Sequence, residues 1–141
     1  MGISRKADYA LRVMVELAGA DREPISTRAL ADMVDAPYAF IAKIVGELAV
    51  GGFVELLRGR GGGVKLAADP ETTTALAVLE AVNGPLTMNK CVYEPQSCPR
   101  SEFCALRDAF ADAQRRLEEA MSVDLLTLAT SQRHKLAAIC G

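Results

Sequence analysis

The feature that most restricts the fold is the basic, glycine-rich run at 58–63, Arg58-Gly59-Arg60-Gly61-Gly62-Gly63. Glycine is unfavourable inside helices and strands but suits turns. The run lies between two short stretches with strand character, 53–57 and 64–67. The sequence therefore predicts a β-hairpin with a glycine-rich loop at this point.

Helices are predicted before the hairpin. Apolar residues three and four apart indicate an amphipathic helix over 4–18 that Ser4 caps. A second helix over 28–34 follows a turn, with Ser26 or Thr27 as its cap. Pro37 fits a first helical turn and starts a third helix, over 37–50. Two helices followed by a strand, a glycine loop and a strand are typical of a winged helix-turn-helix.

The second half follows a different pattern. A further helix over 72–82 completes a winged helix-turn-helix domain at 1–82, whereas 83–104 has no usable periodicity. Apolar residues then alternate four and three apart, which predicts a long dimerisation helix over 105–130. The tail at 131–141 is assigned no structure. The predicted fold is mainly α with a small β wing and a long C-terminal dimerisation helix.

Composition narrows the class of protein. The chain has 141 residues, 50% of them hydrophobic and 24% charged, which is ordinary for one globular domain. No apolar run approaches the roughly 20 residues of a membrane span, and no signal peptide is recognisable at the start. We therefore expect a cytoplasmic protein with no membrane partner. The absence of a nucleophile–base pair or a paired-acid motif argues against an enzyme.

The net charge of −2 excludes nucleic-acid binding by bulk attraction, so any such contact needs a local basic patch. The only charges over 56–66 are Arg58, Arg60 and Lys65. Arginine is attracted to a narrow DNA minor groove, glycines let a loop tip approach phosphates, and Lys65 adds a phosphate contact. The alternative is a solvated hairpin turn; no nucleotide-binding glycine motif is present.

The exposed start of the third helix is the predicted reader of the major groove. Tyr38 and Lys43 are the leading contacts, with Arg28 as a phosphate contact. The alternatives are a partly buried Tyr38 and solvated charges at Lys43 and Arg28. The predicted DNA-binding residues are Arg28, Pro37, Tyr38, Ala39, Lys43, Arg58, Arg60, Gly61, Gly62, Gly63 and Lys65.

Cysteines indicate a second site. Cys91, Cys98 and Cys104 are separated by six and then five residues, too far apart for the usual zinc knuckle. Soft thiolates also bind iron-sulfur clusters, although a four-iron cluster needs a fourth ligand. A thiol-disulfide sensor and simple packing are the alternatives. Cys140, near the end of the sequence, is interpreted as a free thiol.

Taken together, Ala7-Asp8-Tyr9-Ala10-Leu11-Arg12, the 58–63 loop and the three cysteines before a long helix resemble the Rrf2 family of bacterial regulators. The resemblance covers about residues 1–128. It implies a homodimer with winged helices and a crossed dimerisation helix. It also suggests membership of the iron-sulfur subgroup, which includes NsrR-like, RirA-like and IscR-like regulators.

The resemblance also implies a ligand set. IscR-like members complete a [2Fe-2S] site with a histidine three residues after the last cysteine, where this chain has Arg107. NsrR-like members use an aspartate on the first helix of the opposite subunit as the fourth ligand of a [4Fe-4S] cluster, and the matching residue is Asp8. A [4Fe-4S] cluster on Cys91, Cys98, Cys104 and Asp8 is therefore preferred over [2Fe-2S]. Alternatively, Asp8 only interacts with the helix dipole.

These inferences predict a repressor that binds double-stranded operator DNA and senses nitric oxide, redox state or iron and cluster status through the cluster. A cluster joining two subunits would fix the separation of the recognition helices. Two alternatives remain: a cluster-free winged-helix regulator that switches by disulfide formation, and an iron-sulfur electron-transfer or cluster-handling protein that does not bind DNA.

Overall fold

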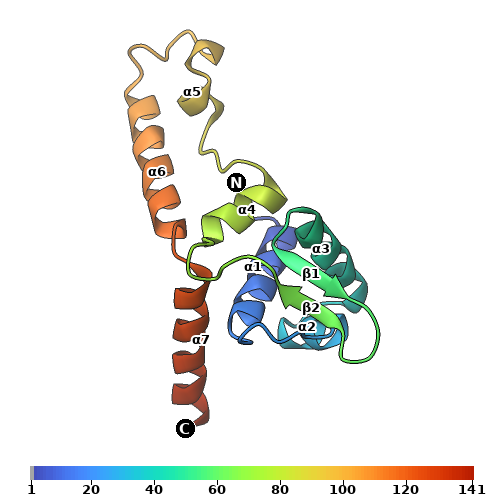
Figure 1. The fold of residues 1–141 in the computed structure, drawn as a ribbon. Helices are drawn as coiled ribbons and strands as arrows, with labels where there is room; N and C mark the ends of the chain where they lie inside the picture. Colours follow the sequence, from blue (N-terminus) through green and yellow to red (C-terminus); the bar gives the residue numbers. More distant parts are fainter. Residues whose placement is uncertain (1) are drawn as a thin grey trace.

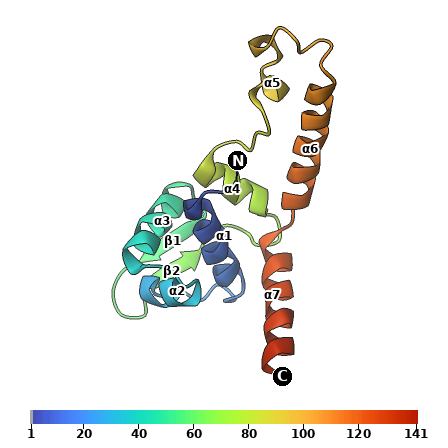
Figure 2. The same cartoon turned by 180° about the vertical axis from the view of Figure 1, so that it is seen from behind.

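The structure, a computed structural model, describes residues 2–141. The elements are α1 (Arg5–Ala18), α2 (Thr27–Met33), α3 (Tyr38–Val50), β1 (Val54–Leu57), β2 (Gly63–Leu66), α4 (Ala75–Asn83), α5 (Lys90–Tyr93), η1 (Pro95–Ser97), α6 (Ala105–Met121) and α7 (Leu125–Cys140). Helices α1–α4, the hairpin and the start of α7 form one body (Figures 1 and 2). The segment 84–104, called the arm below, carries α5 and projects from this body beside α6. The predicted fold class, mainly α with a small β wing, is confirmed.

Side-chain caps set the helix starts. The Ser4 hydroxyl accepts a hydrogen bond from the Ala7 amide at 3.2 Å, as predicted. Ser26, the first of the two predicted candidates, caps α2 in the same way. Helix α4 begins at Ala75, later than predicted, because Thr74 provides its cap.

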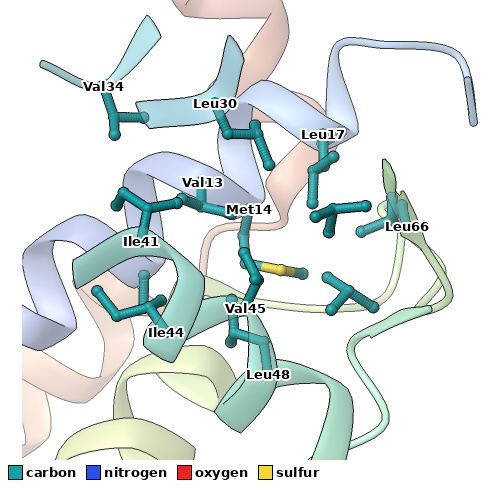
Figure 3. Packing of buried hydrophobic residues seen from close by; sticks show 14 of the residues in the cluster. Val13, Met14, Leu17, Leu30, Val34, Ile41, Ile44, Val45, Leu48 and Leu66 are labelled. Carbon is teal, nitrogen blue, oxygen red and sulfur yellow. The ribbon is translucent and has the colours of Figure 1, made fainter. Parts of the chain in front are cut away.

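The core lies between α1, α2, α3 and the hairpin (Figure 3). Met14, Leu30, Ile41 and Ile44 come from the three helices and are at most 1% exposed. Val64 closes the core from the hairpin side at 1% exposure. Burying such side chains stabilises a fold by about 1.5–3 kcal/mol each, so this body has its own source of stability.

The hairpin is antiparallel, with Val54 opposite Leu66 and Leu57 opposite Gly63. Its second strand also pairs with the entrance to α2. The Ile25 amide donates to the Val64 carbonyl at 2.9 Å, and the Val64 amide donates to the Ile25 carbonyl at 2.7 Å. The wing is thereby fixed to the segment that starts the helix-turn-helix.

The prediction of one continuous helix over 105–130 is wrong, because this stretch forms two helices, α6 and α7. The helix is interrupted before α7, where Asp124 caps α7 and accepts a hydrogen bond from the Thr127 amide at 2.8 Å. Two backbone hydrogen bonds hold the break against the start of α4: Ala75 donates to Val123 at 2.9 Å, and Leu125 donates to Thr73 at 3.0 Å.

Helix α7 belongs to the body of the same chain. It packs against α1 and buries Leu125 and Ala129. The prediction of no structure over 131–141 is wrong, because α7 continues to Cys140. No helix within residues 2–141 has the length and hydropathy needed to cross a membrane.

Candidate functional site

The predicted DNA-binding residues come from α2, α3 and the wing. Figures 1 and 2 show the wing loop and α2 at the same end of the body. Three of these residues are partly buried, Gly62, Gly63 and Lys65. The others are exposed, namely Arg28, Pro37, Tyr38, Ala39, Lys43, Arg58, Arg60 and Gly61. The fold therefore gathers side chains from three elements that are separate in sequence.

One contact joins α2 to α3 on this face. The Arg28 guanidinium carbon lies 4.7 Å from the centre of the Tyr38 ring, within the range of a cation–π interaction. Tyr38 remains 47% exposed. The Tyr38 ring therefore lies on the surface, with the Arg28 guanidinium over it.

The wing glycines have two different roles. A Cβ at Gly62 would collide with the Leu57 carbonyl, and one at Gly63 would lie 2.6 Å from the Ile25 carbonyl oxygen. These two glycines are required within the hairpin. Gly61, by contrast, has a positive φ of 74° and open space around its Cβ position. The close approach to phosphates expected for the whole glycine run is available mainly at the loop tip.

The three clustered cysteines lie on the projecting arm. Cys91 is in α5, Cys98 follows η1, and Cys104 precedes the first residue of α6. All three are free thiols with intermediate exposure. Cys140, at the exposed end of α7, is separate from them in sequence. The arm therefore holds its thiols outside the hydrophobic core.

Two side chains of α6 hold the arm. Arg107, at the position where IscR-like members have a histidine, donates from Nε to the Cys91 carbonyl at 3.0 Å. Gln114 accepts a hydrogen bond from the Met88 amide at 2.7 Å and donates to the Leu86 carbonyl. Neither role is visible in the sequence, because the three hydrogen bonds join residues 16 to 28 positions apart.

The predicted ligands are not assembled within one chain. Over residues 2–141, no three histidine, cysteine, aspartate or glutamate side chains are grouped closely enough to hold a metal ion. Asp8 lies on α1 in the body and forms a salt bridge with Arg12, 2.9 Å between Oδ2 and NH2. The spacing of four residues on one helix was a signal for this pair.

The arm nevertheless has the chemistry of a thiolate site. A cavity of about 480 Å³ is lined by Pro95, Gln96, Cys98, Pro99, Ser101, Glu102 and Arg107. Ser101 is only 9% exposed, and its hydroxyl has no hydrogen-bond partner. An unsatisfied buried donor beside a free thiol suits a site that takes up an acceptor such as sulfur. The three thiols are thus of the ligand type that an iron-sulfur cluster needs, although they are not gathered around one point within this chain.

Helix α6 has no buried residue although its sequence is amphipathic. Leu106 is 64% exposed and Leu117 is 36% exposed. Its charged face is internally paired: Arg115 donates to Asp112 at 2.6 Å, and this hydrogen bond is the main reason why the pKa of Asp112 lies below its usual value. The apolar side of α6 is therefore only partly covered, with Phe110 and Ala113 partly buried between the two exposed leucines.

Comparisons with known proteins match this architecture. The Rrf2 family, described as iron-dependent transcriptional regulators, matches residues 3–130. The transcriptional repressor NsrR of Streptomyces coelicolor is 32% identical over 123 residues, covering 86% of this chain and 82% of that protein. The regulator CymR of Bacillus subtilis is 29% identical over 110 residues, covering 77% of this chain and 80% of that protein.

Solved structures agree on the fold. The structure of CymR, the global cysteine regulator of B. subtilis, superposes with a TM-score of 0.79 at 24% identity, covering 93% of this chain and 98% of that one. The IscR structure from T. potens gives a TM-score of 0.73 at 19% identity, covering 93% and 88%. With a winged-helix body, a basic wing and a family match over most of its length, the chain belongs to the Rrf2 family of DNA-binding transcriptional regulators.

Proposed function

We propose that this protein is a homodimeric repressor whose affinity for operator DNA depends on a [4Fe-4S] cluster. Cys91, Cys98 and Cys104 of one subunit and Asp8 of the partner subunit would hold the cluster. The observation that carries the proposal is the arm, where three free thiols lie outside the core next to a helix that buries nothing. The family resemblance supports the same ligand set.

We expect the wing and α3 to contact different grooves of the DNA. Arg58 and Arg60 extend from the wing toward the minor groove, where arginine is favoured. Lys43 lies in the first half of α3, the part of a recognition helix that enters the major groove. In a two-fold dimer, the two α3 helices would meet half-sites about 34 Å apart.

The exposed leucines of α6 support the proposed dimer. An amphipathic helix buries its apolar side against a partner, and in α6 that side is only partly covered: Leu106 and Leu117 are exposed, whereas Phe110 and Ala113 are partly buried. A second α6 is self-complementary by symmetry. Leu106 and Leu117 would pack in that interface.

The cluster would supply a redox-active, oxygen- and nitric-oxide-sensitive centre joining the two subunits. The chain's own part is to present Asp8 on α1, which requires its carboxylate to leave Arg12. Helix α1 is also linked to α3 by the Lys6–Glu47 salt bridge, at 3.1 Å. A change at Asp8 would thus affect α1, which directly contacts the recognition helix α3.

The signal is proposed to be nitric oxide, redox state or iron supply. An aspartate oxygen is a harder ligand than thiolate, so the fourth position would be the weakest of the site. That weakness suits a sensor better than a permanent structural centre.

A cluster-free thiol regulator is the second candidate. It is favoured by the fact that the thiols are free and not gathered around a common point. One similar solved structure is described as an oxidised form of CymR from Staphylococcus aureus. In this mechanism two thiols would form one disulfide, and two electrons and two protons would pass to a cellular oxidant.

Anaerobic purification with iron and sulfide analysis separates the two candidates. We expect about four irons per subunit in the wild type. The iron should be lost in Cys98→Ala and reduced in Asp8→Ala, while Cys140→Ala serves as the matched thiol control and keeps it. Fresh anaerobic protein without iron would reject the cluster and leave the thiol mechanism.

A further inference from the structure

Arg28 and Tyr38 contact each other on the surface of the helix-turn-helix. Arg28 is the second residue of α2, and Tyr38 is the first residue of α3. The guanidinium lies over the ring at 4.7 Å, and both side chains are on the surface. The two helices of the helix-turn-helix are therefore joined at their exposed ends by one arginine.

The arginine is not held there by an acid. Asp32 lies one turn further along α2, at the spacing that favours an ion pair, yet no salt bridge within residues 2–141 includes Arg28. The guanidinium lies over the ring and carries five N–H donors, none of which is used in a salt bridge of the described residues. The geometry thus leaves a positive charge with free donors on the surface.

We infer that Arg28 is a DNA-phosphate contact and that Tyr38 is the positioning residue that holds it; this inference rests on the proposed function. In a helix-turn-helix the first helix crosses the DNA backbone, and Arg28 is on that helix. The Tyr38 ring is covered on one side by the guanidinium. It therefore acts as a platform for Arg28 in preference to reading a base edge.

The start of α2 is fixed on its other side as well. Ile25 is paired with Val64 of the wing through hydrogen bonds of 2.9 and 2.7 Å, and Ser26 caps the helix. The segment that carries Arg28 is thus tied to the wing and, through Tyr38, to the recognition helix. A phosphate bound by Arg28 would set the position of both DNA-reading parts.

The test is fluorescence anisotropy at several KCl concentrations. The probes are a labelled operator duplex, selected from random DNA with the wild-type protein, and an unrelated duplex of equal length. Arg28→Ala is expected to weaken binding by a similar factor on both duplexes, and to reduce the slope of log affinity against log salt by about one per subunit. Lys135→Ala, on the exposed end of α7, is the matched loss of one positive charge and should leave the operator affinity unchanged.

The tyrosine is tested through its ring. Tyr38→Leu should weaken binding about 2- to 5-fold, the range of an exposed cation–π contact, whereas Tyr38→Phe keeps the ring and should bind like the wild type. In an Arg28→Ala background, Tyr38→Leu should have no further effect. Arg28→Lys keeps the charge but loses the fork of guanidinium donors, so it should retain the salt slope while binding more weakly than the wild type.

Several results would overturn the inference. Unchanged binding by Arg28→Ala removes the contact, and a loss confined to the operator makes Arg28 a base reader. Additive effects of Arg28→Ala and Tyr38→Leu, or equal damage by Tyr38→Phe, remove the positioning role. If the wild type selects no DNA, the proposed function itself fails. Circular dichroism and the Tm of each variant establish that it is folded.

Discussion

The body and the arm of this chain differ in where their stability comes from. The body buries side chains from α1, α2, α3, the hairpin, α4 and α7 in one cluster. The arm and α6, in contrast, bury only Ser101. Gln114 and Arg107 hold the arm by a few hydrogen bonds. A region without a core of its own is free to take its stability from a second subunit or a bound cofactor.

A matched pair of leucine truncations tests this comparison with the largest expected effect. Leu48 in α3 is 1% exposed, whereas Leu106 in α6 is 64% exposed. Leu48→Ala should lower the free energy of unfolding by about 2–5 kcal/mol, because it leaves a cavity in the core. Leu106→Ala should instead weaken dimerisation. Urea unfolding and sedimentation equilibrium measure the two quantities.

The comparison would break if Leu106→Ala destabilised the dissociated chain as strongly as Leu48→Ala does. That result would mean that α6 packs within its own subunit.

A glycine pair tests how the wing is attached to the body. Gly63→Ala would place a Cβ 2.6 Å from the Ile25 carbonyl oxygen at a φ of 145°. We expect a loss of about 1–3 kcal/mol in unfolding free energy, together with weaker DNA binding. Gly46→Ala in α3 is the control, because no atom lies within 4 Å of its Cβ position. It should raise stability by about 0.5–1 kcal/mol. Equal stability changes in both variants would contradict the close approach.

Hydrogen exchange tests how loosely the arm is held. In Gln114→Ala the Met88 amide loses its acceptor, so its exchange should be about 2- to 12-fold faster while the core amides of α1 stay unchanged. Gln132→Ala, which removes the hydrogen bond from Gln132 to Glu16, is the matched control and should not alter Met88. Faster exchange throughout α1 in the Gln114 variant would show that the arm and the body unfold together.

The smallest expected effect concerns the pH dependence of the α6–α7 break. The hydrogen bond from the Thr127 amide lowers the pKa of Asp124, and the Thr127 hydroxyl adds to the shift. The ionised carboxylate therefore stabilises the fold above its unfolded pKa of about 4. That contribution is lost as pH falls through the lower, folded pKa.

Asp124→Asn should thus reduce the Tm by a few degrees at neutral pH and by less in strong acid. The check is thermal unfolding followed by circular dichroism across that range. A difference between the two proteins that does not change with pH would assign the effect to the side chain's shape and not to its charge.

Much of the fold was predictable because the signals are local. Ser4 and Ser26 cap helices where their positions indicated, and the two strands flank the glycine loop as expected. The start of α7 was missed although Asp124, with Thr127 three residues later, is a local cap signal. The spacing of apolar residues before it favoured one continuous helix.

The candidate sites were predictable by residue type and not by arrangement. The three cysteines and the basic wing stood out in the sequence. Their spacing, however, says nothing of Arg107 bonded to the Cys91 carbonyl. Nor does it show that Asp8 is engaged with Arg12 on the body.

The sequence by itself determined the helices, the hairpin and the reactive residue types, because caps, periodicity and glycine runs act over a few neighbouring residues. Only the tertiary structure decided that the Arg28 guanidinium lies over the Tyr38 ring, that Gly63 faces the Ile25 carbonyl and that α7 packs on α1. Those contacts join segments that are distant in sequence. Their distances follow from how the core packs, which no local pattern contains.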